Sequence, residues 1–386
     1  MKRRIHRLSA VLVCVFAGTV FGFSFWNEVK AQTGSKSLRD VGLLLGLRRK
    51  VAVPNREEAA WGQYRTIWIS RTDGLIHVDE VPNLLVPRQE GFWRVGSNVS
   101  EYASLWHRRA EFIWRAPLGR PIRLHELTAE ETNDSYHREY RHGYEEGRTI
   151  VFISEDYIGV SHWFFDADTD THAMSQSALS AFSDSAMYVF DDSEFKHPLD
   201  IYNDVASFAG RDSLPGKVRR KELADWKDFP EMKLSGCESI SGAGQPWVVV
   251  RKRGQWMLTL TGVWNHGECY DYDSPDVKTS VHAPVSLVGF DELPLPWSGV
   301  KKLFPDATDS FGSPTSDLLV VLTRGELFVC EQAGRGFRKP VARFPLHEGE
   351  KAVMAQWALG ESVIHWNHHF EAAKEGPVVP SGLPTN

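Results

Sequence analysis

The sequence predicts a mainly β fold, built from antiparallel hairpins with short helical inserts. Apolar runs of strand length recur in pairs, and turns that contain glycine separate most of these pairs. Valine, isoleucine, threonine and aromatic residues dominate the runs, as is typical of strands. No long helical pattern alternates with them, so a parallel βαβ sheet is not expected. An irregular β-propeller is the expected arrangement, and a sandwich-like stack of sheets is the alternative.

Hairpins are expected at six places along the chain. Their paired runs are residues 65–70 with 75–78, 84–86 with 92–95, 149–154 with 157–163, 247–251 with 255–261, 318–323 with 326–329, and 352–358 with 361–366. Asp-Gly, Arg-Gly and Leu-Gly turns join several of them, which suits tight hairpin turns. The stretch 318–366 holds about four strands and is the part most similar to a propeller blade.

Short helices are expected between the hairpins. The ranges are 99–109, 171–182, 198–208, 217–226 and 297–304. Asn98 precedes the first range and Glu101 follows three residues later, a spacing close to that of a capping box.

The N-terminal residues predict the compartment in which the protein works. Basic residues at positions 2, 3, 4 and 7 precede an uncharged run from Leu8 to Trp26, and Val29 and Ala31 are small residues before Gln32. This layout is typical of a signal peptide of residues 1–31, with an uncleaved membrane anchor as the alternative. We therefore expect a secreted, periplasmic or cell-envelope protein. Residues 32–373 are expected to form one mainly β extracytoplasmic domain, followed by a flexible proline-rich tail, 374–386.

The charge of the chain limits its partners. The whole sequence carries a formal net charge of −6, and removing the predicted signal peptide makes the remainder more acidic. Such a surface argues against nucleic acid as a partner, and a membrane is expected only if the N-terminal segment is retained as an anchor. The many tryptophans mainly indicate core packing, while a minority suits a glycan or peptide surface.

The cysteines predict one disulfide in an oxidising compartment. Cys237 and Cys269 flank a hairpin-like segment and are the expected pair. Cys330 lies inside an apolar run, where a buried free thiol is the ordinary outcome.

Asp166, Asp168 and Asp170 form the sharpest cluster of possible metal ligands. Alternating carboxylates begin calcium-binding loops, but Thr171 and Ser177 replace the glycine and the glutamate that such loops require. A solvated acidic turn before the predicted 171–182 helix is therefore expected, with Ca²⁺ as the alternative. No other cofactor is expected.

His365, His368 and His369 are the second group of candidate ligand-binding residues. In the predicted strand His365 and His369 share one face, where their side chains are about 13 Å apart, too far to share a metal ion. They converge only if the chain turns at Asn367. Packed or surface histidines are therefore the expected outcome, and a metal site the alternative.

The sequence contains no local catalytic motif. It lacks a phosphate-binding loop, a nucleophile elbow and a His-Glu-x-x-His pattern. The expected function is therefore a non-enzymatic binding or scaffold module, with an extracytoplasmic protein or glycan as partner. One alternative is an extracellular hydrolase that acts on glycans through paired carboxylates. The other is the extracytoplasmic sensor domain of a membrane-anchored protein.

Overall fold

The computed structural model describes residues 40–53, 56–102, 108–120, 144–166, 171–182, 247–260, 277–333, 336–337 and 340–375. The chain divides into two compact units, Met1–Arg39 and Asp40–Asn386, and every described residue belongs to the second. The predicted signal peptide and the predicted helices at 198–208 and 217–226 lie outside the described residues.

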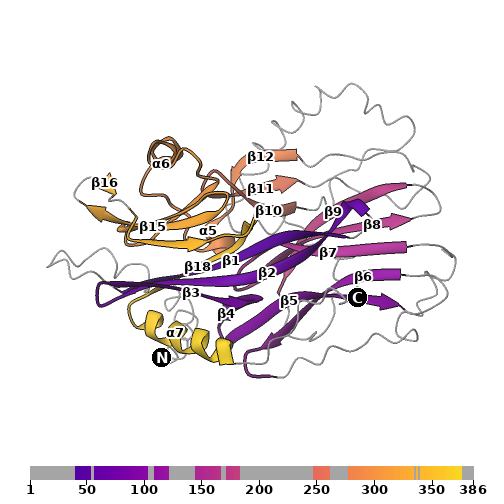
Figure 1. Ribbon diagram of the computed structural model, residues 1–386, viewed down its shortest axis with the longest axis horizontal. Helices are drawn as coiled ribbons and strands as arrows, with labels where there is room; N and C mark the ends of the chain where they lie inside the picture. Colours follow the sequence, from indigo (N-terminus) through magenta and orange to yellow (C-terminus); the bar gives the residue numbers. More distant parts are fainter. Residues whose placement is uncertain are drawn as a thin grey trace, which may run out of the picture. The chain divides into compact units, whose positions relative to one another are not determined.

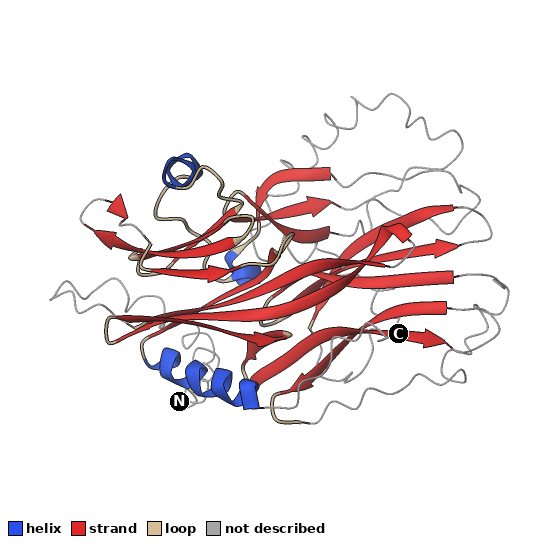
Figure 2. Ribbon diagram, in the orientation of Figure 1, coloured by secondary structure: helices blue, strands red, loops and turns tan. Residues whose placement is uncertain are grey.

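The described strands form four sheets (Figures 1 and 2). The first sheet has the order β18 (Lys351–Leu359), β1 (Val41–Val53), β2 (Arg56–Thr72), β3 (Leu75–Pro82). The second has the order β4 (Leu84–Arg88), β5 (Gly91–Tyr102), β6 (Arg108–Pro117), β7 (Tyr144–Ile153), β8 (Tyr157–Asp166), β9 (Thr171–Ala181). The third has the order β10 (Trp247–Lys252), β11 (Gln255–Leu260), β12 (Val277–His282). The fourth has the order β13 (Asp309–Gly312), β14 (Leu318–Leu322), β15 (Glu326–Ala333), β16 (Gly336–Phe337), and β17 (Ala342–Pro345) also pairs with β15.

The mainly β class with antiparallel pairing is confirmed. Among the described strands only β6 and β7 run parallel, and none of the four sheets closes on itself. The finer expectation of a propeller or a sandwich stays a prediction.

Five of the six expected hairpins are present. They are β2–β3, β4–β5, β7–β8, β10–β11 and β14–β15. In β2–β3 the two turn residues, Asp73 and Gly74, have φ angles of 52° and 77°. Arg253 and Gly254 of β10–β11 have φ angles of 55° and 78°. Two positive φ angles in a two-residue loop match the twist of the flanking strands, which explains why these turns form hairpins.

The sixth expected hairpin is wrong in its second half. Strand β18 forms as predicted, but Gly360 adopts a φ of 58° and the chain continues as helix α7 (Glu361–Glu375). Within α7 the buried residues are Val363, Phe370 and Ala373. These positions, with the half-buried Trp366 between them, follow the period of a helix rather than that of a strand. The helix includes Lys374 and Glu375, the first two residues of the expected tail.

Two of the expected helices are strands. Of the expected helix 99–109, residues 99–102 belong to β5 and residues 108–109 to β6, and the residues between them lie outside the described part of the chain. Asn98 pairs with Phe112 of β6 instead of capping a helix. Residues 171–181 form β9, which pairs with β8. Partner strands determine both outcomes, because strand formation depends more on pairing and packing than on intrinsic preference. The helix expected at 297–304 is confirmed as α6 (Trp297–Leu303), and a short helix, α5 (Val285–Val288), precedes it.

The first sheet lies between two hydrophobic cores. Along β1, Leu43 and Leu45 enter one core and Leu44 enters the other, because successive strand side chains point to opposite faces. The first core also contains residues of β10, β11, β14 and β15. The second contains residues of the second sheet and of α7. Burial on both faces explains the nearly continuous apolar sequence of β1.

Candidate functional site

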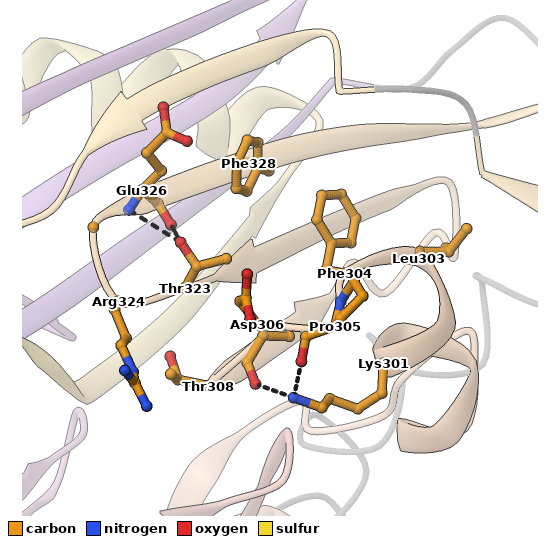
Figure 3. A pocket seen from close by; sticks show the side chains of 12 residues that line it. Lys301, Leu303, Phe304, Pro305, Asp306, Thr308, Thr323, Arg324, Glu326 and Phe328 are labelled. Carbon is orange, nitrogen blue, oxygen red and sulfur yellow. Dashed lines mark hydrogen bonds between the residues drawn. The ribbon is translucent and has the colours of Figure 1, made fainter.

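A cavity of about 760 Å³ lies between the end of α6 and the turn that joins β14 to β15 (Figure 3). Helix α6 contributes Lys301 and Leu303, and the loop that follows contributes residues 304–308. The turn contributes residues 323–326, and strand β15 contributes Phe328. We call this cavity the α6 pocket.

Local sequence explains how the walls of the α6 pocket are placed. Helix α6 follows Pro296 and ends at Leu303, because the next residue, Phe304, has a φ of −133°, which is not helical. The next loop returns to strand β14, because the backbone N–H of Thr308 donates to the Leu322 carbonyl at 2.7 Å. The Thr308 hydroxyl donates to the same carbonyl at 3.1 Å. These two bonds hold the loop against the hairpin that forms the opposite wall.

One wall of the pocket is aromatic. The rings of Phe304 and Phe328 lie 5.1 Å apart with an angle of 32° between their planes. Both are half-buried and pack on a small core formed by buried residues of α6, β14 and β15 with Ala307. The guanidinium of Arg343 lies 5.4 Å from the centre of the Phe328 ring. The wall therefore offers a ligand an apolar surface whose position is fixed by packing.

The rest of the pocket lining is polar. The Lys301 ammonium donates to the carbonyls of Pro305 and Ala307, which anchors it to the loop. The Thr323 hydroxyl donates to the Glu326 carbonyl at 2.9 Å and accepts from the Glu326 N–H at 3.1 Å, which closes the turn.

Four charged side chains line the pocket, and all four are exposed to solvent. They are those of Lys301, Asp306, Arg324 and Glu326. The pocket thus combines an apolar wall with groups of both charges, within the range of volumes typical of small-molecule sites. Such a lining has the chemical character that suits a polar ligand with an apolar face. Its two carboxylates, on Asp306 and Glu326, are also the residue types that a glycan hydrolase needs.

The histidines of the second candidate group lie on α7, not on a strand. The helix brings the Nε2 atoms of His365 and His369 to 3.2 Å, with their ring centres 4.5 Å apart. His368 is exposed on the same helix. Burial lowers the pKa of His369, and the nearby His365 and His368 lower it further. The expectation that His365 and His369 stand far apart is therefore wrong, because four residues span about one turn in a helix.

Helix α7 is held to the first and second sheets by aromatic contacts. The His369 ring stacks on Phe92 of β5, with centres 4.6 Å apart and planes at 23°. The Trp68 indole N–H of β2 donates to the Asn367 side-chain oxygen at 3.2 Å. Trp366 also meets the edge of Phe92 at 5.6 Å. These contacts fix the rotation of α7 and thus the direction of its histidines.

Most of the other predicted site residues lie outside the described part of the chain. Asp166 is the last residue of β8 and pairs with Thr171 of β9, so the acidic segment stands before a strand and not before a helix. Asp168 and Asp170 lie outside the described residues, as do Cys237 and Cys269. The solvated acidic turn, with Ca²⁺ binding as its alternative, and the disulfide therefore stay predictions. In the part that the structure describes, no group of three or more His, Cys, Asp or Glu side chains is placed to hold a metal ion.

Cys330 is buried and free, as predicted, and burial raises the pKa of its thiol to about 11. It belongs to the small core behind the aromatic wall of the α6 pocket. A thiol with so high a pKa stays protonated at neutral pH and is a poor nucleophile. Cys330 therefore packs the wall and does not act in the pocket.

A buried ion-pair network lies between the third and fourth sheets. The Arg251 guanidinium binds the carboxylates of Asp291 at 2.6 Å and Asp309 at 3.0 Å, and it lies over the Trp256 and Phe311 rings. Burial raises the pKa of Asp291, although Arg251 and the Trp256 N–H act in the opposite direction. These groups bind one another, so the network joins the two sheets. None of its residues lines the α6 pocket.

Sequence reasoning did not identify the α6 pocket. It predicted the helix and the hairpin that form the two walls, but no spacing connects Lys301 and Phe304 with Arg324 and Phe328. The run of lysine, phenylalanine and aspartate between residues 301 and 306 was the only local signal of a polar and aromatic surface.

Comparisons with protein-family models, with curated proteins and with solved structures found no match to this chain. Among the helices that the structure describes, none has the length and the apolar character needed to cross a membrane.

Proposed function

We propose that this protein is a secreted or envelope-associated binding module that holds a glycan in the α6 pocket without chemical change. The observation that carries the proposal is the lining of the pocket, in which the Phe304–Phe328 wall faces a cavity rimmed by charged side chains. Sugar rings have an apolar face and polar edges, so they suit such a combination. An extracytoplasmic peptide is the other partner with similar properties.

A hydrolase that acts on glycans is the second candidate, because Asp306 and Glu326 line the same pocket. Glycoside hydrolysis requires one carboxyl group as acid and a second as base or nucleophile. The two candidates differ in a simple way: a binding module leaves the glycan intact, and a hydrolase shortens it. The sensor alternative adds only an anchor to the binding module and leaves the role of the pocket unchanged.

The test is calorimetric titration of the full chain with a panel of neutral hexasaccharides: cello-, xylo-, malto- and chitohexaose. We expect saturable binding of at least one of them, with no shortening of the bound sugar in overnight chromatography. Binding that is accompanied by shortening would favour the hydrolase. If no member of the panel binds, the glycan proposal is rejected in favour of a peptide partner.

Two arginines allow a matched comparison of variants. Arg324 lines the pocket and precedes the turn glycine Gly325, whereas Arg253 precedes the turn glycine Gly254 in another hairpin and lies outside the pocket. Both side chains are exposed. Arg324→Gln should weaken glycan binding by about tenfold or more, because a charge-assisted hydrogen bond contributes about 1.5–3 kcal/mol. Arg253→Gln should leave it unchanged, and an equal loss in both variants would place the glycan elsewhere.

A further inference from the structure

Two histidines of α7 have the geometry of a metal chelate. The Nε2 atoms of His365 and His369 face each other at 3.2 Å, with an angle of 84° between the ring planes. We propose that this pair binds one divalent transition-metal ion of the class that prefers imidazole, such as Ni²⁺, Cu²⁺ or Zn²⁺. The site is separate from the α6 pocket, to which α7 contributes no residue.

The distance between the two nitrogens suits a shared ion. Bonds from zinc to imidazole nitrogen are about 2.0–2.1 Å long. With the two nitrogens 3.2 Å apart, such bonds make an angle of about 100° at the metal. This angle lies between those of square-planar and tetrahedral coordination, so both kinds of ion fit. The ion takes the place of the proton that the two rings otherwise share in a hydrogen bond.

The fold places the two imidazoles in a position that suits chelation of one ion. Four-residue spacing on a helix places two side chains on one face, and the same spacing supplies two zinc ligands in His-Glu-x-x-His sites. The Phe92 ring stacks on His369 at 4.6 Å, which limits the rotation of that imidazole. His365 is exposed, so an ion reaches the pair from solvent. Water completes the coordination shell, because the described residues provide no third ligand in a group.

The test is calorimetric titration of the full-length chain, purified without a polyhistidine tag, with NiCl₂ and ZnCl₂. We expect one ion per chain at the pair. His365→Gln should weaken this binding by about 10²-fold or more, because the second imidazole then no longer acts at a high effective concentration. His365 is the residue to replace, since it is exposed and does not stack on Phe92 as His369 does.

His368→Gln is the matched control, because it removes an exposed imidazole from the same helix but leaves the pair intact. It should keep the affinity of the unchanged protein. Cu²⁺ added in equal amount should show two coordinated nitrogens by electron paramagnetic resonance, and one in His365→Gln. The same melting temperature for all three proteins in EDTA excludes loss of folding as the cause.

Three results would overturn the proposal. The first is the absence of heat of binding with both ions. The second is an equal loss of affinity in His365→Gln and His368→Gln, which would indicate unspecific binding to several of the 15 histidines in the sequence. The third is binding that neither substitution changes, which would place the ion at another site.

Discussion

Gly42 shows how one residue without a side chain fits the central strand to its neighbours. A Cβ atom at Gly42 would overlap the Trp68 indole on the paired strand β2. That indole cannot move easily, because its N–H binds Asn367 and its ring packs beside Trp366 and Phe370. Glycine at this position therefore allows the tryptophan to lie across β1 and to meet α7.

We predict that Gly42→Ala lowers the free energy of unfolding by about 1–3 kcal/mol, the usual effect of an added methyl group in a packed core. Urea denaturation followed by tryptophan fluorescence measures this difference. Gly336→Ala is the control, because a Cβ at Gly336 meets no atom within 4 Å. Equal effects of the two substitutions would show that Trp68 does not lie against β1 in this way.

At Asp317, hydrogen bonds and a neighbouring charge lower the pKa of the carboxyl group by more than burial raises it. Burial alone would raise its pKa, but hydrogen bonds from Thr315, Arg71 and Ser313, together with the charge of Arg71, lower it. The Arg71 guanidinium is 2.5 Å from the carboxylate, and its side chain is only 1 % exposed. A lowered pKa means that the folded state binds the proton less readily than the unfolded state does.

The contribution of Asp317 to stability is therefore complete above its ordinary pKa of about 3.9 and is lost as the pH falls through its lowered folded pKa. We predict that Asp317→Asn reduces the free energy of unfolding at pH 7 by about 1–3 kcal/mol. The difference from the unchanged protein should shrink as the pH falls below about 4. Denaturation curves at pH 7 and pH 3 measure it. A difference that is the same at both values would mean that Asp317 is not bound as described.

Among the elements, α7 departs most from what its sequence predicted. Val363 and Trp366 alone, in a window of six residues, are compatible with a strand that follows a Leu-Gly turn. The helical period becomes visible only when Phe370 and Ala373 are included. Six residues do not distinguish the two structures, because a helix needs more residues than a strand to show its period.

The same element gives a direct test of helix against strand. We predict that Phe370→Ala lowers the free energy of unfolding by about 3–5 kcal/mol, because the ring is fully buried. Ile364→Ala should change it by no more than about 0.5 kcal/mol, because in the helix this side chain is 52 % exposed. In a strand Ile364 would share a buried face with Trp366. A large effect of Ile364→Ala would therefore contradict the helix.

Tight hairpins were predictable from sequence because their signals are local. Asp73-Gly74 and Arg253-Gly254 adopt the positive φ angles of a two-residue turn, and apolar runs flank both turns. The strand β9 was not predictable, because its alanines and serines carry little preference and the pairing with β8 determines its structure.

At the scale of the whole molecule, the sequence predicted the class of the fold but not its layers. Leu43, Leu44 and Leu45 divide between two cores on opposite faces of the first sheet, and an unbroken apolar run does not indicate such a division. The α6 pocket depends on the same kind of long-range contact. Its two walls meet because Thr308 binds the Leu322 carbonyl, and no pattern in the sequence indicates that bond.

We propose that the α6 pocket holds the partner of this protein. Hydrogen exchange measured by mass spectrometry, on the full chain with and without a saturating hexasaccharide from the panel, locates the bound sugar. We expect slower exchange on binding in residues 301–308 and 323–328, the two walls of the pocket, with little change in the first sheet. Slower exchange confined to other segments, with these two walls unchanged, would contradict it.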